Sequence, residues 1–332
     1  MFVIKYRKIF FFLSGLLVLV SLVVIFIRGL NIGIDFTGGS EFEIQYESNR
    51  PEISEVKQII QDANIENVEK LYIRPIGENS FYFQMQSIAS TTHQAIFDAL
   101  KQSVLIQNTN ESASATAFQN TNKSASATTF QNANTTNITN AVNIITQTKP
   151  AIIGPSAGNE LRAKAYVAII IVVIVIVLFV AYAFRHASDK VSSWNYGIVA
   201  IIALVHDIII PTGFVALLGL EVTSLFVIAL LTILGISVHD TIVVFDRIRE
   251  NVKLKIAREF SEIVGKSLQQ TIVRSINTSL TVLFVLFALF FVGPETTKDF
   301  ALVLAVGLIV GTYSSIFLAS PLLVEIGKKQ GK

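Results

Sequence analysis

Residues Ile9–Ile27 read IFFFLSGLLVLVSLVVIFI, a run of 19 residues without a charged side chain. A helix needs roughly 20 apolar residues to cross the hydrocarbon core of a bilayer, so this run predicts a membrane-spanning helix. Five later stretches are long and apolar enough to do the same: Ala165–Phe184, Asn195–Leu220, Val222–Phe245, Ile272–Val292 and Phe300–Val324. The sequence therefore predicts a membrane protein with an all-α bundle of six transmembrane helices.

The first run has a second interpretation as a cleaved signal peptide. It is longer than the ~7–15 residues of a typical signal-peptide core, and the residues after it, Arg28–Asn31, do not form an A-x-A cleavage site. We therefore predict that Ile9–Ile27 is an uncleaved anchor.

The composition excludes an ordinary soluble enzyme and a disordered chain. Of the 332 residues, 52% are hydrophobic and 15% are charged, whereas soluble domains carry about 25% charged residues. The net charge of +2 is too small to favour nucleic acid as a partner. The chain has no cysteine, which excludes disulfides, thiolate metal sites and a cysteine nucleophile.

Basic residues in the short flanks predict the orientation, because Lys and Arg collect on the cytoplasmic side of a membrane. Lys5, Arg7 and Lys8 precede the first span and place the N-terminus in the cytoplasm. Alternation puts the basic segment 247–266 and the C-terminus on the same side. The predicted division is 1–28 (N-terminus and helix 1), 29–164 (a non-cytoplasmic domain), 165–326 (helices 2–6) and 327–332 (a cytoplasmic tail).

The non-cytoplasmic region has the pattern of a small α/β domain. Its predicted elements, in chain order, are a strand at Glu41–Tyr46, a helix at Pro51–Ala63, strands at Val68–Ile73 and Phe81–Met85, a helix at Ser90–Leu105 and a strand near Ala141–Ile153. This order, β-α-β-β-α-β, predicts a ferredoxin-like domain.

A repeat interrupts this domain at about 107–140. Ser112–Asn122 recurs as Ser124–Asn134, and a stretch made mainly of Ser, Ala, Thr and Asn cannot bury a core. We predict a flexible low-complexity insertion, with a partner-binding β-ribbon as the functional alternative.

Five ionisable residues inside the predicted spans are candidates for function: His206, Asp207, His239, Asp240 and Arg274. A charge at the bilayer centre costs about 2.5–3.5 kcal/mol on insertion scales, so such side chains face protein or water. Asp240 and Arg274 belong to consecutive antiparallel spans and lie at similar depth.

Two interpretations of these residues remain open. In the structural one, Asp240 neutralises Arg274, or Arg274 reaches the surface. In the functional one, Asp240 and Arg274 form a proton relay, and proton entry releases about 2.3 kcal/mol per 100 mV to drive a conformational change. Asp207 with His206 is either an accessory part of such a relay or a static hydrogen-bonded pair.

A third hypothesis, from another class, makes the two His-Asp pairs ligands of a divalent metal in an intramembrane hydrolase. Adjacent residues on a helix diverge by ~100°, so each pair more easily supplies one ligand than two. No Gly-x-Ser-x-Gly, His-x-x-x-His or phosphate-loop motif is present. We therefore expect no enzymatic activity, no metal and no cofactor.

Long motifs border and fill the spans. The chain reads NIGIDFTGGS at Asn31–Ser40, GPSAGNELR at Gly154–Arg162 and LTILGISVHDTIVVFDRIREN at Leu231–Asn251. With Ser275–Leu280 and Asp299–Ser315, these stretches resemble the SecF family of bacterial protein-export subunits, which belongs to the RND superfamily. The first motif is closer to SecF than to the L-D-L-x-G-G counterpart of SecD.

The resemblance implies a function. Six spans of SecF, an RND-type half, pair with six of SecD, and the SecDF complex uses the proton-motive force across the inner membrane to help unfolded polypeptides leave the SecYEG channel; YajC is a candidate further partner. Asp240 and Arg274 match family positions implicated in proton transport, while another required Asp belongs to SecD. His239 stands where many relatives carry Asn.

The resemblance also marks a set of structural motif residues. They are Gly33, Asp35, Phe36, Gly38, Gly39, Gly154, Pro155, Gly158 and Glu160. The glycines of the first motif are expected to shape the connection from membrane to sheet. The alternative function with the same fold is a stand-alone RND-type half-transporter of a lipid or small molecule.

Overall fold

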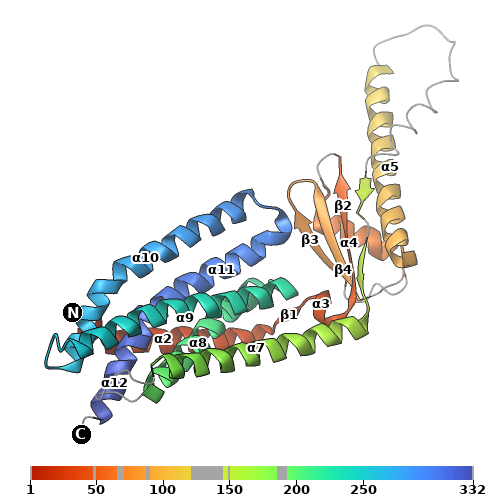
Figure 1. Ribbon diagram of the computed structural model, residues 1–332. Helices are drawn as coiled ribbons and strands as arrows, with labels where there is room; N and C mark the ends of the chain where they lie inside the picture. The colour runs from red at the N-terminus through yellow and green to blue at the C-terminus, as the bar shows by residue number, and fades with distance from the viewer. Residues whose placement is uncertain are drawn as a thin grey trace. The chain divides into compact units, whose positions relative to one another are not determined.

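The computed structural model describes residues 2–47, 50–65, 71–86, 90–120, 145–148, 150–184 and 193–330 (Figure 1). The chain divides into two compact units. Met1–Gly33 and Leu161–Lys332 form the first, which is almost entirely helical, and Ile34–Glu160 form the second, which contains a sheet.

Among the described residues, six helices are long and apolar enough to cross a membrane, which agrees with the predicted number of spans. They are α2 (Arg7–Arg28), α7 (Pro155–Ala183), α8 (Ser193–Leu218), α9 (Ser224–Lys253), α10 (Phe260–Val292) and a sixth built from α11 (Glu295–Tyr313), the π-helical turn η2 (Ser314–Ala319) and α12 (Ser320–Gln330). A short helix, α1 (Phe2–Lys5), precedes α2.

The helices α9 and α10 extend beyond the apolar runs that predicted them. The runs end at Phe245 and begin at Ile272, whereas α9 continues to Lys253 and α10 starts at Phe260. Side chains join the two extensions: Asn251 Nδ2 donates to Ser267 Oγ at 2.8 Å. An apolar run therefore marks where a helix crosses the bilayer, and polar contacts carry the helix further.

The centre of the helical unit consists of α8, α9 and the sixth helix. Half or more of the apolar window of each is buried, whereas only 6% is buried in α2 and in α7, and 11% in α10. On α7 the exposed side chains are mostly apolar, including Ile171, Val175 and Phe179. That composition suits a surface that lipid tails can cover.

Small residues bring the membrane helices close together, as is common in bilayers. Gly213 of α8 faces Ser21 of α2 so closely that a Cβ on the glycine would lie 2.7 Å from the Ser21 Cα. The segment after α2 also reaches the α8–α9 loop, where β1 (Asn31–Ile32) pairs in parallel with β7 (Glu221–Val222).

The second unit begins with α3 (Ile34–Thr37) and then has the order β-α-β-β-α-β-β, with two short strands where one last strand was predicted. Its elements are β2 (Gly39–Tyr46), α4 (Ile53–Asp62), β3 (Tyr72–Ile76), β4 (Ser80–Met85), α5 (Ser90–Asn120), β5 (Ile145–Gln147) and β6 (Ala151–Ile153). The strands are ordered β3-β4-β2-β5, with β6 also on β2, and every pair is antiparallel.

Strand alternation builds the core of this unit. Phe42 and Ile44 of β2 lie opposite Phe83 and Phe81 of β4, and all four side chains are buried. They pack with apolar residues of the two helices, among them Val56 and Ile60 of α4 and Ile96 and Leu100 of α5. One face of the sheet is thus covered by α4 and α5.

Three elements differ from their predicted ranges. The strand predicted at Val68–Ile73 begins at Tyr72, and residues 66–70 lie outside the described part. The strand predicted near Ala141–Ile153 is two strands, β5 and β6, that pair with opposite ends of β2. Helix α5 continues past Leu105 to Asn120 because residues 106–120 contain neither Pro nor Gly to end it; the rest of the predicted insertion lies outside the described residues.

The two glycine motifs of this unit contact each other through their backbones. Gly38 and Gly39 have φ values of +74° and +142°, which favour glycine. A Cβ on Gly38 would lie 2.7 Å from the Pro155 Cα, and one on Gly158 would lie 2.8 Å from the Gly38 nitrogen. Pro155 is the first residue of α7, a position that proline favours. The two motifs therefore pack against each other. This role is more specific than the expected one of shaping the connection from membrane to sheet.

The other motif residues lie around this contact. Gly33 belongs to the helical unit, where its N–H donates to the Val222 carbonyl at 3.0 Å. Asp35 and Phe36 lie on α3, with Phe36 buried, and Glu160 is an exposed residue in the second turn of α7.

Candidate functional site

The outward surface of α9 and α10 carries polar residues within the membrane-spanning part of the unit. The exposed residues that define this polar face are Thr232 and His239 on α9 and Arg274, Asn277, Thr278 and Thr281 on α10. The two residues on α9 are two helical turns apart, and those on α10 lie three, four and seven residues after Arg274, so each set stays on one side of its helix. A lipid-facing helix surface normally lacks such side chains, so this face differs in kind from the apolar surface of α7.

Asp240 lies next to this face but points into the protein. Its side chain is buried, whereas its neighbour His239 is exposed, because adjacent residues on a helix point in different directions. Ser279 of α10 lies within hydrogen-bonding reach of the Asp240 carboxyl. The Ser279 hydroxyl in turn is 2.6 Å from Thr312 Oγ1 of α11. Asp240 is thus the start of a polar contact that joins three helices.

Arg274 has no such contact. Its guanidinium forms no ion pair or hydrogen bond within the described residues, and Asp240 is not its ion-pair partner there. The Arg274 side chain instead lines a pocket of about 320 Å³ with Val243, Asp246, Arg247, Glu250, Gln270 and Thr271. This pocket lies at the end of the spans from which the α9 and α10 extensions project, so polar groups lead from that end of the bundle to Arg274.

Arg247 fixes the two walls of this pocket. Its Nε donates to Gln270 Oε1 of α10 at 2.6 Å, and its Nη1 contacts Glu250 Oε2 at 2.5 Å. Asp246 forms an ion pair with Arg249 one turn further along α9. Arg247 therefore holds α9 against α10 beside Arg274.

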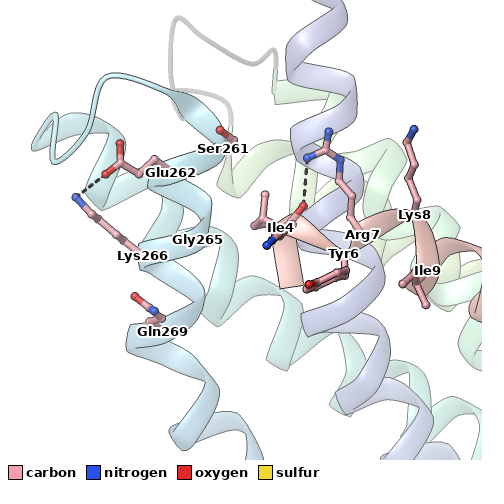
Figure 2. A pocket seen from close by; sticks show the side chains of 11 residues that line it. Ile4, Tyr6, Arg7, Lys8, Ile9, Ser261, Glu262, Gly265, Lys266 and Gln269 are labelled. Atoms are coloured by element: carbon pink, nitrogen blue, oxygen red, sulfur yellow. Dashed lines mark hydrogen bonds and ion pairs between the residues drawn. The ribbon is translucent and has the colours of Figure 1, made fainter. Parts of the chain in front are cut away.

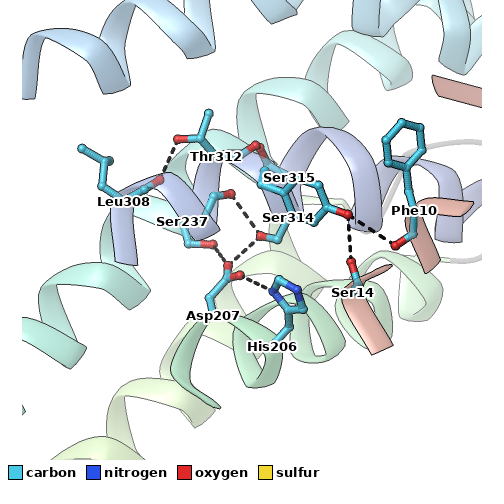
Figure 3. Close-up of polar contacts among 11 residues, drawn as sticks. Phe10, Ser14, His206, Asp207, Ser237, Leu308, Thr312, Ser314 and Ser315 are labelled. Carbon is cyan, nitrogen blue, oxygen red and sulfur yellow. Dashed lines mark hydrogen bonds and ion pairs between the residues drawn. The ribbon is translucent and has the colours of Figure 1, made fainter. Parts of the chain in front are cut away.

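A second polar cluster lies in the interior around Asp207 of α8 (Figure 3). Asp207 is fully buried and accepts hydrogen bonds from Ser237 of α9 and from Ser314 of η2, the latter at 2.7 Å. His206 Nδ1 is 2.8 Å from the other carboxyl oxygen. This is the hydrogen-bonded pair that one interpretation of the sequence described, extended by two hydroxyl groups from other helices.

The ring of His206 continues the cluster toward α2. It stacks on Tyr313 with ring centroids 6.2 Å apart, and the Tyr313 hydroxyl donates to the Phe10 carbonyl at 3.3 Å and accepts from Ser14 at the same distance (Figure 3). His206 Nε2 is buried without a hydrogen-bond partner in the described part of the chain. Four separate helical segments therefore meet at one polar centre inside the bundle.

The structure separates the five predicted residues into two groups. Asp240, His239 and Arg274 lie at the α9–α10 surface, and His206 and Asp207 lie inside. Ser237 connects the groups, since it contacts Asp207 and precedes Asp240 by one helical turn. The described residues contain no cluster of three or more His, Asp or Glu side chains that would suit a metal ion.

Sequence reasoning missed the hydroxyl residues of these clusters: Ser237, Ser279, Thr312 and Ser314. The sequence does contain a signal for these contacts, because each of the four is a hydroxyl residue within an apolar run. It is a weak signal, since such residues also bond to their own helix, as Thr278 does to the Arg274 carbonyl at 2.9 Å.

The sequence of the chain matches known protein families. The family model described as protein export membrane protein SecD/SecF, C-terminal, matches residues 131–329, more than half of the sequence. The chain belongs to the SecD/SecF family. The SecD/SecF GG motif matches residues 23–49, which include the glycines at the Pro155 contact.

Relatives named as translocase subunits agree with this assignment. The protein translocase subunit SecF of Thermobaculum terrenum is 36% identical over 97% of this chain and 93% of its own length. That of Petrotoga mobilis is 32% identical over 98% of this chain and 96% of its own. Membership of the SecD/SecF family therefore supports a role in protein translocation.

A solved structure shows the same fold. The crystal structure of SecDF from Thermus thermophilus matches 99% of this chain with a TM-score of 0.73 and 29% identity. The chain spans 38% of that longer SecDF chain. In this relative a SecF-like part is thus fused to further sequence, which supports association of this chain with a SecD counterpart.

Proposed function

We propose that this SecD/SecF-family chain pairs with SecD and uses the proton-motive force to promote export of polypeptides across the bacterial inner membrane. The observation that carries the proposal is Arg274, a charged side chain on the outward surface of a membrane helix without a partner in the described residues. A charge at that depth requires protein or water beside it. The polar face is therefore where the transmembrane part of SecD docks.

In this proposal Asp240 and Arg274 are the proton relay. Asp240 takes up and releases the proton, and the fixed charge of Arg274 favours release of the proton when the guanidinium approaches the carboxyl. Because the two side chains are not paired within this chain, their separation can change with the docked partner. The pocket beside Arg274 supplies water from the cytoplasmic end.

The remaining polar residues have accessory roles. Asp207 and His206 hold α8, α9 and η2 together at the interior cluster, and His239 faces the docked subunit beside Asp240. Both termini are cytoplasmic in this proposal, and the Ile34–Glu160 unit is a ferredoxin-like domain on the periplasmic side. SecYEG supplies the emerging polypeptide, and YajC is a further partner of the complex.

The test is Asp240→Asn, which removes the titratable group but keeps its size. We expect the variant to insert, to bind SecD and to lose the proton-dependent stimulation of export in inverted vesicles or cells. Asp62→Asn is the matched control, because Asp62 is an exposed aspartate of α4, outside the helical unit, and this variant should export normally. Normal proton-dependent export by Asp240→Asn would refute the relay.

The alternative occupant of the polar face is a second copy of this chain, as in a stand-alone RND-type half-transporter of a lipid or small molecule. Purification from native membranes separates the two proposals. Recovery with a SecD-type subunit supports the translocase, and recovery as a homodimer supports the half-transporter.

A further inference from the structure

A pocket of the helical unit lies where the N-terminal segment meets the start of α10, away from the polar face. Its volume is about 690 Å³, within the range of roughly 300–1,000 Å³ typical of ligand sites. One wall is the segment Ile4–Ile9, and the other consists of residues between Ser261 and Gln269 (Figure 2).

The lining of this pocket is positively charged. Four of its eleven residues are basic, namely Lys5, Arg7, Lys8 and Lys266, and Glu262 is the one acidic residue. Glu262 is paired with Lys266, whose Nζ is 3.1 Å from its carboxylate (Figure 2). Arg7 also has partners within the protein: it forms an ion pair with Glu325 of α12 and donates to the Ile4 carbonyl at 3.2 Å.

Two basic residues of the pocket are available to a ligand. Lys5 and Lys8 are exposed, and neither forms an ion pair or hydrogen bond within the described residues. The ammonium of Lys5 lies 5.4 Å from the centre of the Tyr6 ring, a contact that a bound anion would not disturb. The pocket thus offers two free positive charges to a ligand.

Both walls of the pocket lie at the depth of the lipid head groups. Lys8 immediately precedes the apolar run Ile9–Ile27, and Lys266 and Gln269 are among the last polar residues before the run that starts at Ile272. A site at this level meets phosphate groups from the membrane rather than from bulk solution.

An exposed apolar stripe continues from the pocket along α2. Ile9 and Phe12 are 60% and 72% exposed, and Leu16 and Leu19 follow them at helical spacing. A molecule bound in the pocket would therefore have a hydrocarbon-compatible surface directly beneath its charged end.

We propose that this pocket binds the phosphate-bearing head group of an anionic phospholipid, with the acyl chains along Ile9 and Phe12 of α2. Lys5 and Lys8 bind the phosphate, and α10 forms the opposite wall of the pocket. Arg7 holds the first wall in place through its contact with α12. The bound lipid bridges the N-terminal segment and α10, which are distant in the sequence.

The test measures lipid binding by native mass spectrometry and by titration of the full-length protein with phosphatidylglycerol or phosphatidylcholine. The double variant Lys5→Gln/Lys8→Gln should bind phosphatidylglycerol roughly 30-fold more weakly, since each lysine near an anionic surface contributes about a factor of five. The matched control is Lys253→Gln/Lys255→Gln, which removes two exposed lysines outside the pocket and should change binding less than about threefold.

A second variant covers the case in which loss of N-terminal lysines disturbs insertion. Lys266→Gln leaves the first span unchanged and leaves Glu262 unpaired in the pocket, so it should also weaken phosphatidylglycerol binding. Equal affinity for the two lipids, or equal behaviour of the pocket and control variants, would overturn the proposal. Complete competition by millimolar inorganic phosphate would identify a soluble phosphate site and would overturn the lipid assignment.

Discussion

Gly158 is a place in the α/β unit where one added methyl group would meet backbone atoms directly. Its missing side chain lets the first turn of α7 contact the backbone at Gly38. Gly158→Ala should lower the unfolding free energy of the unit by about 1–3 kcal/mol, as overpacking commonly does. Hydrogen–deuterium exchange of β2 and β4 in the full-length chain measures this loss.

Gly154 supplies the control in the same motif. A Cβ at Gly154 has no heavy atom within 4 Å, so Gly154→Ala should leave the exchange of β2 and β4 unchanged. Equal protection in the Gly154 and Gly158 variants would show that the two motifs do not depend on each other.

His93 makes the stability of the same unit depend on pH. It is buried, its Nε2 is 2.6 Å from Ser40 Oγ, and burial lowers the pKa of the imidazole. The folded unit therefore binds this proton less readily than the unfolded chain does. The contribution to stability is complete above the unfolded pKa of about 6.5 and is lost as the pH falls below it.

We expect protection of β2 against hydrogen exchange, corrected for the intrinsic rate, to be lower at pH 5 than at pH 7.5. His93→Gln keeps a partner for Ser40 but does not titrate, so its protection should change less between these pH values. An identical loss in both proteins would assign the pH effect to other groups.

The candidate residues themselves could be predicted from sequence, but their partners could not. Asp207, Asp240 and Arg274 are visible because a charge inside an apolar run is rare and costly. The partners Ser237, Ser279 and Ser314 depend on how each helix is rotated about its axis. A serine or threonine in a helix can satisfy itself on its own backbone, so its presence does not indicate a contact to another helix.

At the scale of the helices, the contact between α2 and α8 depends on a small residue. Gly213→Ala would place a Cβ 2.4 Å from the Ser21 Cβ and 2.7 Å from its Cα, so the helices must move apart. We expect a loss of about 1–3 kcal/mol in stability, measured as a lower midpoint of thermal unfolding in detergent.

Gly197 lies on the same helix and has open space at its Cβ position. Gly197→Ala should match or slightly exceed the stability of the parent chain, because alanine favours a helix more than glycine does. A loss as large in Gly197→Ala as in Gly213→Ala would contradict an effect of packing.

The sequence predicts which helices form, but it does not predict where each helix begins and ends. Hydropathy identified all six spans, because burial in lipid requires long apolar runs. It did not identify the extensions of α9 and α10, which are stabilised by polar contacts such as Arg247 to Gln270, nor the start of α7 at Pro155. Those ends are determined by contacts between segments distant in the sequence.

At the scale of the molecule, two surfaces of the helical unit predict different neighbours. In the proposed complex the polar face of α9 and α10 contacts another protein, and the apolar surface of α7 suits lipid. A photo-cross-linking amino acid at Thr278 should therefore form an adduct with another polypeptide in native membranes. The same group at Val175, which is 56% exposed on α7, should give mainly lipid adducts. Equal protein adducts at both positions would contradict this assignment of surfaces.

The ion pair between Arg7 and Glu325 has a consequence for biosynthesis. Its two residues are 318 positions apart, and Ser14 likewise meets Tyr313, 299 positions further on, so α2 contacts a helix that is synthesised much later. At roughly 5–20 residues per second, α2 waits on the order of 15–60 s in the membrane before that partner emerges from the ribosome. During this interval α8, through Gly213 and Ser21, can occupy part of its surface. The contact between α2 and the sixth helix therefore forms late, and a nascent chain arrested before residue 313 retains an open side.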